Sequence, residues 1–160
     1  MGCVRAVYCV VWLLMTIGTA CIVTSLATSY WRGYGNIHEG LFEKCDSECE
    51  FIKFFDEGRS KEFETLRLLM MGGAALLGIA MILSIISPCV EKDLFFALTV
   101  LDTIAFLCCA SGIAIYTYHY SNNSLYSWKW SFMIGWTGVS LYGMGLFMLF
   151  LASCLITEEQ

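Results

Sequence analysis

Residues 6–31 read AVYCVVWLLMTIGTACIVTSLATSYW, and this stretch contains no charged side chain. Stretches 68–90 and 130–156 are also free of charge, and a fourth, 94–118, carries only Asp102. Each is long enough to cross the hydrocarbon core of a bilayer, which takes about 20 helical residues. Because backbone polar groups in lipid must be satisfied within the segment, each stretch is expected to be a helix. The sequence therefore predicts an integral membrane protein with four membrane-spanning helices.

Composition agrees with this class and limits what else the chain can contain. Hydrophobic residues make up 58% of the 160 residues, and the mean hydropathy is +0.69, whereas soluble domains are about 45–50% apolar. The net charge of −5 lacks the basic excess that nucleic-acid binding requires. We expect one all-α membrane domain, 1–160, with spans at about 6–29, 67–88, 94–118 and 130–155, a long loop at about 30–66 and a second loop at about 119–129.

The two longer loops share one side of the membrane because the number of spans is even. Cys45 and Cys49 lie in the first of them, and Asn122 begins an N-x-S glycosylation acceptor in the second. Both features fit an oxidising, glycosylating compartment. The positive-inside rule does not support this orientation, since most Lys and Arg residues lie on the loop side. We nevertheless expect a multi-pass plasma-membrane protein with both termini in the cytoplasm.

The first span differs from a cleaved signal peptide in its length. Arg5 supplies a short positive region before it, and Ser25-Leu26-Ala27 loosely resembles a cleavage site. The apolar run is longer than the roughly 7–15 residues of a signal core. We expect the first helix to be retained.

The long loop is expected to begin with strands and to end with a helix. Short apolar pieces are separated by glycines that favour turns, and they lie at 30–31, 41–42, 51–52 and 54–55. Cys45 and Cys49 would then close a tight hairpin through a disulfide. A metal site at this C-x3-C pair has only His38 as a nearby further ligand, so we expect no metal. From Ser60 the apolar spacing becomes helical and runs into the second span, with Arg67 at the water boundary.

Several of these residues together suggest a family. One set of residues resembles the W…GLW…C…C signature of claudins. It consists of Trp31, Gly40-Leu41-Phe42 and the cysteine pair, and it precedes a span that opens with Leu66-Arg67-Leu68. The segments 115–117 and 130–136 resemble the peripheral myelin protein, epithelial membrane protein and lens intrinsic membrane protein branch of the same superfamily. The resemblance covers essentially the whole chain.

This resemblance implies a left-handed four-helix bundle with a small extracellular antiparallel sheet from the first loop, stapled by the cysteine pair. Trp31, Leu41 and Phe42 would lie where the sheet meets the outer leaflet, as aromatic residues favour that interface. The chain departs from the family in three ways: Phe42 replaces the usual Trp, the cysteine spacing is short, and the C-terminal residues 157–160 lack the apolar end that PDZ domains bind.

Asp102 is the costliest residue of the spans, because a carboxylate there costs about 2.5–3.5 kcal/mol on insertion scales. One interpretation is an ion or proton site. The other, which we prefer, is a protonated or hydrogen-bonded acid that packs against Thr, Ser or Tyr of a neighbouring helix.

Other residue patterns have structural or lipid-related interpretations. Glycines and alanines within the spans fit close helix packing or self-association. Cys3, Cys89 and Cys154 lie near the ends of spans and are candidate palmitoylation sites. No catalytic arrangement or phosphate-binding loop is recognisable, so we expect no enzyme, no cofactor, no nucleic-acid partner and no small-molecule substrate.

The resemblance favours a protein that mediates cell–cell contact or membrane organisation through its loop and through lateral contacts, with itself or with a membrane protein in cis or in trans. One alternative is an auxiliary subunit of an ion channel or receptor. A second is a paracellular cation pore-former.

Overall fold

Four long helices form the body of the protein, which is seen in a computed structural model that describes residues 2–53, 61–86, 92–121 and 127–158. The helices are α1 (Gly2–Leu26), α2 (Lys61–Ile86), α3 (Lys92–Tyr120) and α4 (Trp130–Glu158). They are apolar on all faces, as expected for helices surrounded by lipid and by one another. The parts long and apolar enough to cross a membrane are Val7–Leu26, Lys61–Ser84, Phe96–Tyr120 and Trp130–Ala152. The prediction of a multi-pass, four-span membrane protein is therefore confirmed.

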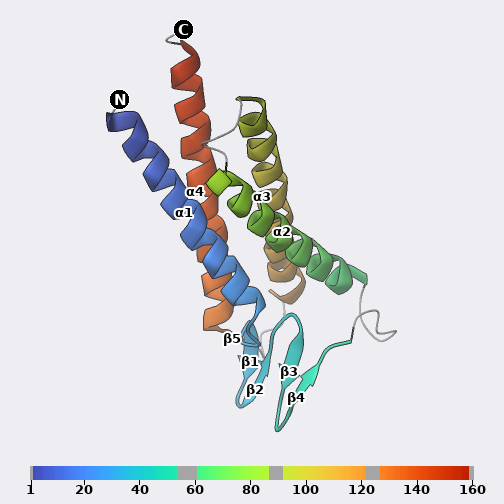
Figure 1. Ribbon diagram of the computed structural model, residues 1–160. Helices are drawn as coiled ribbons and strands as arrows, with labels where there is room; N and C mark the ends of the chain where they lie inside the picture. The colour runs from blue at the N-terminus through green and yellow to red at the C-terminus, as the bar shows by residue number, and fades with distance from the viewer. Residues whose placement is uncertain (1, 54–60, 87–91, 122–126, 159–160) are drawn as a thin grey trace.

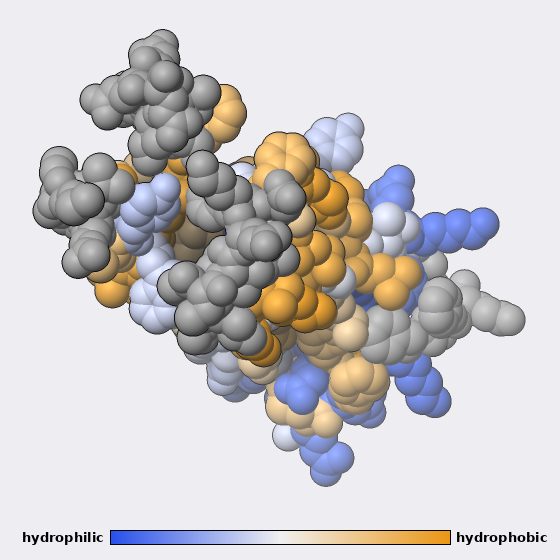
Figure 2. Space-filling view, turned by 45° about the horizontal axis from the view of Figure 1, so that its top comes forward, coloured by the Kyte–Doolittle hydropathy of each residue, from blue (hydrophilic) through white to orange (hydrophobic). Residues whose placement is uncertain are grey.

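The helices associate as two pairs. The most extensive contacts join α1 to α4 and α2 to α3, while contacts between the pairs are fewer. Both termini lie at one end of the bundle and the sheet lies at the other (Figure 1). In Figure 2, hydrophobic residues cover the helices and hydrophilic residues gather toward the sheet end. The left-handed crossing of the helices stays a prediction.

The α1–α4 pair is close because glycines line it. A Cβ atom added at Gly18 would lie 2.9 Å from the carbonyl oxygen of Gly138 and 2.9 Å from the backbone nitrogen of Tyr142. A Cβ atom added at Gly138 would lie 2.8 Å from the Gly18 oxygen. Small residues at such crossings allow helix backbones to approach in a membrane. These two glycines thus have a packing role within the chain.

A small antiparallel sheet covers one end of the bundle. Its strands are β1 (Arg32–Tyr34), β2 (Ile37–Glu39), β3 (Glu43–Cys45), β4 (Cys49–Phe51) and β5 (Ser127–Trp128), in the spatial order β4-β3-β2-β1-β5. A two-residue turn joins β1 to β2, and Gly35 in it has a φ of 58°, which glycine adopts without steric cost. The expected antiparallel sheet is present.

The strands do not coincide with the apolar pieces from which we predicted them. Trp31 precedes β1, and residues 41–42 lie between β2 and β3. Of the piece 51–52, Phe51 ends β4 and Ile52 follows it, whereas residues 54–55 lie outside the described part of the chain. Trp31, Leu41 and Ile52 are buried. The apolar side chains fasten the loop to the helices, while the more polar neighbouring residues form the ladders.

The sheet is also not built from the first loop alone. Strand β5 comes from the second loop and pairs with β1, with Arg32 opposite Trp128 and Gly33 opposite Ser127. The backbone nitrogen of Lys129 donates to the carbonyl of Trp31 at 3.0 Å, which extends this pairing toward α4. Both loops therefore lie at the same end of the bundle.

Candidate functional site

Trp31 anchors the sheet to the bundle. Its side chain is 0% exposed, and its indole N–H donates to the carbonyl oxygen of Ser25 at 2.7 Å. The ring meets Tyr116 edge-on, with 4.8 Å between ring centroids, and Phe132 at 5.9 Å. Such aromatic pairs contribute about 0.5–1.5 kcal/mol beyond their buried area. The sheet is thereby held against α1, α3 and α4.

Trp31 and Leu41, which we expected where the sheet meets the outer leaflet, lie between the sheet and the helices. Both side chains are 0% exposed, so they contact protein. The adjoining Gly40 is also tightly placed, since an added Cβ atom would lie 2.6 Å from the carbonyl oxygen of Thr28. These motif residues therefore pack the short sheet against the ends of the helices.

Polar groups of α1 and α4 meet beside Trp31. The Ser25 hydroxyl donates to the carbonyl oxygen of Ser131 at 2.8 Å, and the Ser131 hydroxyl donates to the carbonyl oxygen of Ser25 at 3.1 Å. Thr28 shares a hydrogen bond with the Ser131 hydroxyl. Both serines are 0% exposed. This reciprocal pair fixes the ends of the two helices where the sheet begins.

Arg67, which we expected at the water boundary, is buried within the protein. Its side chain is 0% exposed. The guanidinium group donates to the carbonyl oxygens of Ile52 at 3.0 Å and Lys53 at 3.3 Å, and to the Glu64 carboxylate at 3.3 Å. Its carbon lies 5.1 Å from the ring centroid of Phe42, a cation–π distance. Arg67 ties the chain just after β4 to the start of α2.

A second arginine ties the sheet to α3. Arg32 forms an ion pair with Glu39 of the neighbouring strand at 2.8 Å, and its guanidinium carbon lies 3.7 Å from the ring centroid of Tyr120. Burial acts to lower the pKa of Arg32, but Tyr116 and Glu39 outweigh that effect, and the pKa is raised. Arg32 is therefore protonated at every physiological pH.

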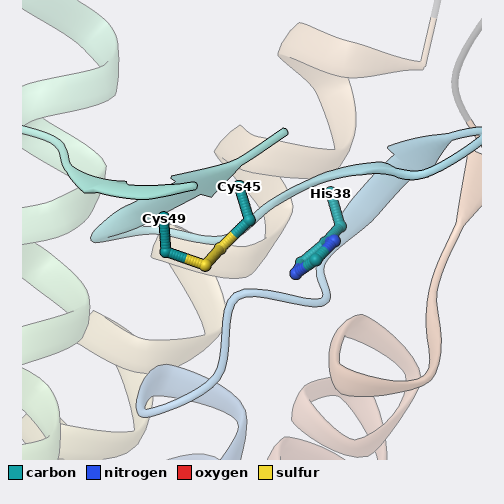
Figure 3. A group of neighbouring side chains, drawn as sticks. All are labelled: His38, Cys45 and Cys49. Atoms are coloured by element: carbon teal, nitrogen blue, oxygen red, sulfur yellow. A yellow bond between two sulfur atoms is a disulfide. The ribbon is translucent and has the colours of Figure 1, made fainter. Parts of the chain in front are cut away.

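Cys45 and Cys49 form the disulfide at the ends of the β3–β4 hairpin, with their Cα atoms 4.0 Å apart. Figure 3 shows the imidazole of His38 beside this disulfide. The possible ligand atoms of the three residues lie within 4.8 Å of one another. Because both sulfur atoms are used in the disulfide, they are not thiolates, which are the form that binds metal. His38 instead stacks on Tyr30, with 4.1 Å between centroids.

The intramembrane acid faces the bundle interior. Asp102 on α3 is 8% exposed, and the hydroxyl of Tyr142 on α4 donates to one of its carboxylate oxygens at 2.5 Å. This hydrogen bond is one of the arrangements that we considered from the sequence. It links the two helix pairs at a depth where an unpaired polar group is costly.

The candidate modification sites cannot be placed in the fold. Asn122 and Cys89 lie outside the described residues, and so do the side chains of Cys3 and Cys154. Glycosylation and palmitoylation at these positions stay predictions.

Sequence reasoning missed the residues that hold the sheet in place. The local sequence gives no reason to single out Ser25, Ser131 or Tyr116 within the apolar spans. Their partners are far away in the chain. Glu39 is one acidic residue among many in the loop. The sequence around Arg67 shows Glu64 one turn earlier, but it does not show the carbonyl oxygens of Ile52 and Lys53.

A bundle of four apolar helices with a sheet at one end defines the class: a tetraspan membrane protein. The lipoma HMGIC fusion partner-like protein family model matches residues 8–128, most of the chain, and the protein belongs to that family. A comparison with curated proteins found no match.

The family assignment corrects the resemblance that we drew from the sequence. The claudin, peripheral myelin protein, epithelial membrane protein and lens intrinsic membrane protein group is a different tetraspan family. The residues that suggested it, such as Trp31 and Gly40, fasten the sheet to the ends of the helices. That physical requirement is not specific to one family, which is why the pattern misled us.

Proposed function

We propose that this protein is an auxiliary subunit that packs laterally against a larger membrane protein, an ion channel or a receptor. The family assignment favours this interpretation over the contact-forming role that we first preferred. The proposal includes a plasma-membrane location, cytoplasmic termini and a role without catalysis. The partner is bound within the membrane, and the sheet end of the subunit then lies beside the partner's exposed part.

One observation on α2 carries the proposal. Glycine in a helix interior costs roughly 0.5–1 kcal/mol relative to alanine, so it usually has a packing reason. Gly73 has one, because an added Cβ atom would lie 2.6 Å from the sulfur of Cys109. A Cβ atom added at Gly72 or at Gly78 would meet nothing within 4 Å. Packing within the described chain therefore does not account for these two glycines.

Gly72, Ala75 and Gly78 recur at every third residue of α2, and we call these three residues the α2 strip. Large apolar side chains lie among them on the same side of the helix: Leu68, Met71, Ile79 and Ile82, which are 43–62% exposed. Small residues on an exposed helix face allow the backbone of another helix to approach closely, which favours helix association in lipid. We infer that the strip receives a transmembrane helix of the partner.

The test is a purification with matched variants. The full-length tagged protein is purified in mild detergent from cells that normally produce it, and co-purifying proteins are quantified by mass spectrometry. We expect a multi-span channel or receptor in near-stoichiometric amount. Replacing Gly72 and Gly78 together with Leu should reduce its recovery by roughly tenfold or more, since filling a packed interface costs about 1–3 kcal/mol.

The control is Ala114→Leu, which adds the same kind of side chain on the exposed face of α3. It should leave recovery unchanged. Equal losses with both variants, or recovery of only further copies of this chain, would contradict the proposal. In the second case the strip would be a self-association surface.

A further inference from the structure

A cavity of about 770 Å³ lies between the helices at the end of the bundle that carries the termini. All four helices contribute to its wall, with Trp12 and Met15 from α1, Ala80 from α2, Leu98 and Asp102 from α3, and Leu149 from α4. Protein interiors contain few voids larger than a water molecule. A space of this volume is instead within the range of ligand pockets, about 300–1,000 Å³.

The wall of the cavity indicates the chemistry of an occupant. It is mostly apolar, which disfavours a water-filled space and favours a hydrocarbon body. Trp12 is 46% exposed and the adjoining Leu13 is 55% exposed, so the cavity is not sealed from its surroundings. Ligand pockets of this kind combine an apolar lining with a few polar groups that fix orientation. Asp102 is such a group here.

The carboxylate of Asp102 can accept further hydrogen bonds besides the one from Tyr142. That bond engages one oxygen atom, and a carboxylate can accept at both. Among the described residues that line the cavity there is no Lys, Arg or His, so the wall supplies no cation to the acid. A charge pair is stronger in an apolar environment than in water. A cationic group on a ligand would therefore be favoured over a neutral one.

We propose that this cavity binds an amphiphile with one hydrocarbon chain and a single cationic amine, with the amine paired to Asp102 and the chain lying between the two helix pairs. The ligand enters from the lipid. This site goes beyond a docking role for the protein, and it adds a ligand to a chain for which we expected no small-molecule substrate.

The test uses a photoactivatable hexadecylamine that carries an alkyne tag, added to the purified full-length protein in a neutral detergent. Labelled peptides are identified by mass spectrometry. Labelling should be saturable, should fall on residues that line the cavity, and should be displaced by hexadecylamine. Hexadecanol, which has the same chain without the charge, should compete poorly. Equal competition by hexadecanol would overturn the assignment of a cationic ligand.

Two variants and a control locate the site. Asp102→Asn still accepts the hydrogen bond of Tyr142 but lacks the charge, and it should reduce saturable labelling by roughly tenfold or more. Ser84→Phe fills the cavity from α2, where the serine hydroxyl is bonded only to its own helix in the described structure, through Met81. Ser111→Phe is the matched control, because Ser111 is exposed on α3 and likewise donates to its own helix.

We expect Ser84→Phe to abolish labelling and Ser111→Phe to leave it unchanged, with all variants monodisperse on size exclusion. Wild-type labelling of Asp102→Asn or of Ser84→Phe would overturn the proposal, and so would equal loss in the control. Should Asp102→Asn fail to fold, the competition between amine and alcohol on the wild-type protein decides the matter.

Discussion

Arg67 shows that the charge of a side chain does not determine whether it is exposed. A cation just outside an apolar run is expected to face water, but Arg67 is fully buried because its donors reach the carbonyl oxygens of Ile52 and Lys53. Those carbonyls follow an edge strand and need a donor. The sequence contains both partners, yet nothing in their spacing shows that they meet.

Removal of this side chain should be severe. Arg67→Met leaves Glu64, which is 8% exposed, without its cation, and leaves two carbonyl oxygens without their donor. Removing one partner of a buried ion pair typically costs about 3–5 kcal/mol. We expect a markedly lower thermal unfolding midpoint in detergent and reduced delivery to the cell surface.

Lys61→Met provides the comparison, since Lys61 is an exposed cation in the first turn of the same helix. It should behave like the wild type. Similar unfolding midpoints for the two variants would show that Arg67 has no structural role.

At the scale of elements, the helices were predictable and the strands were not. An apolar run of more than 20 residues has few alternatives in a membrane protein. Strands of two or three residues depend on partners elsewhere, and β5 became a strand only because β1 lies beside it. Apolar pairs such as Leu41-Phe42 suggested strands but serve as anchors. The candidate site was predictable only in part: the cysteine pair and Asp102 could be singled out, whereas Tyr142 could not be identified as the partner of Asp102.

The α1–α4 pair provides a test at this scale. Gly18→Ala should separate these helices, because the new methyl group would meet backbone atoms of Gly138 and Tyr142 that cannot rotate away. We expect a destabilisation of about 1–3 kcal/mol, measured as a fall in the unfolding midpoint.

Gly72→Ala makes the same chemical change where nothing lies within 4 Å. It should leave the midpoint unchanged or raise it slightly, because alanine favours a helix over glycine. If Gly18→Ala were equally harmless, close packing of α1 against α4 would be refuted.

For the whole molecule, the sheet determines that the two longer loops face the same compartment. Strands β1 to β4 come from one loop and β5 from the other. The side of the membrane that they face is a separate matter and stays a prediction. The disulfide and the acceptor at Asn122 favour the outside, while the Lys and Arg distribution does not support it.

Labelling of intact cells should show whether the sheet faces the outside or the cytosol. A membrane-impermeant amine reagent should modify Lys44 and Lys53, which are exposed at the sheet end. Lys92, where α3 begins at the other end, should react only after permeabilisation. The reverse pattern would place the sheet in the cytosol. As a second measurement, Asn122→Gln should remove a glycosidase-sensitive mass shift.

The pairing of β1 with β5 also has a consequence for biosynthesis. Ser127 donates a hydrogen bond to Gly33 from 94 positions later in the chain, and α1 makes its most extensive contacts with the last helix. At roughly 5–20 residues per second, the first helix and the first strand wait on the order of 5–20 seconds for their partners to be synthesised. During that interval the nascent chain exposes an open strand edge and the face of α1 that includes Gly18. We therefore expect a chain that stops before residue 127 to be retained by quality control, even though most of its spans are complete.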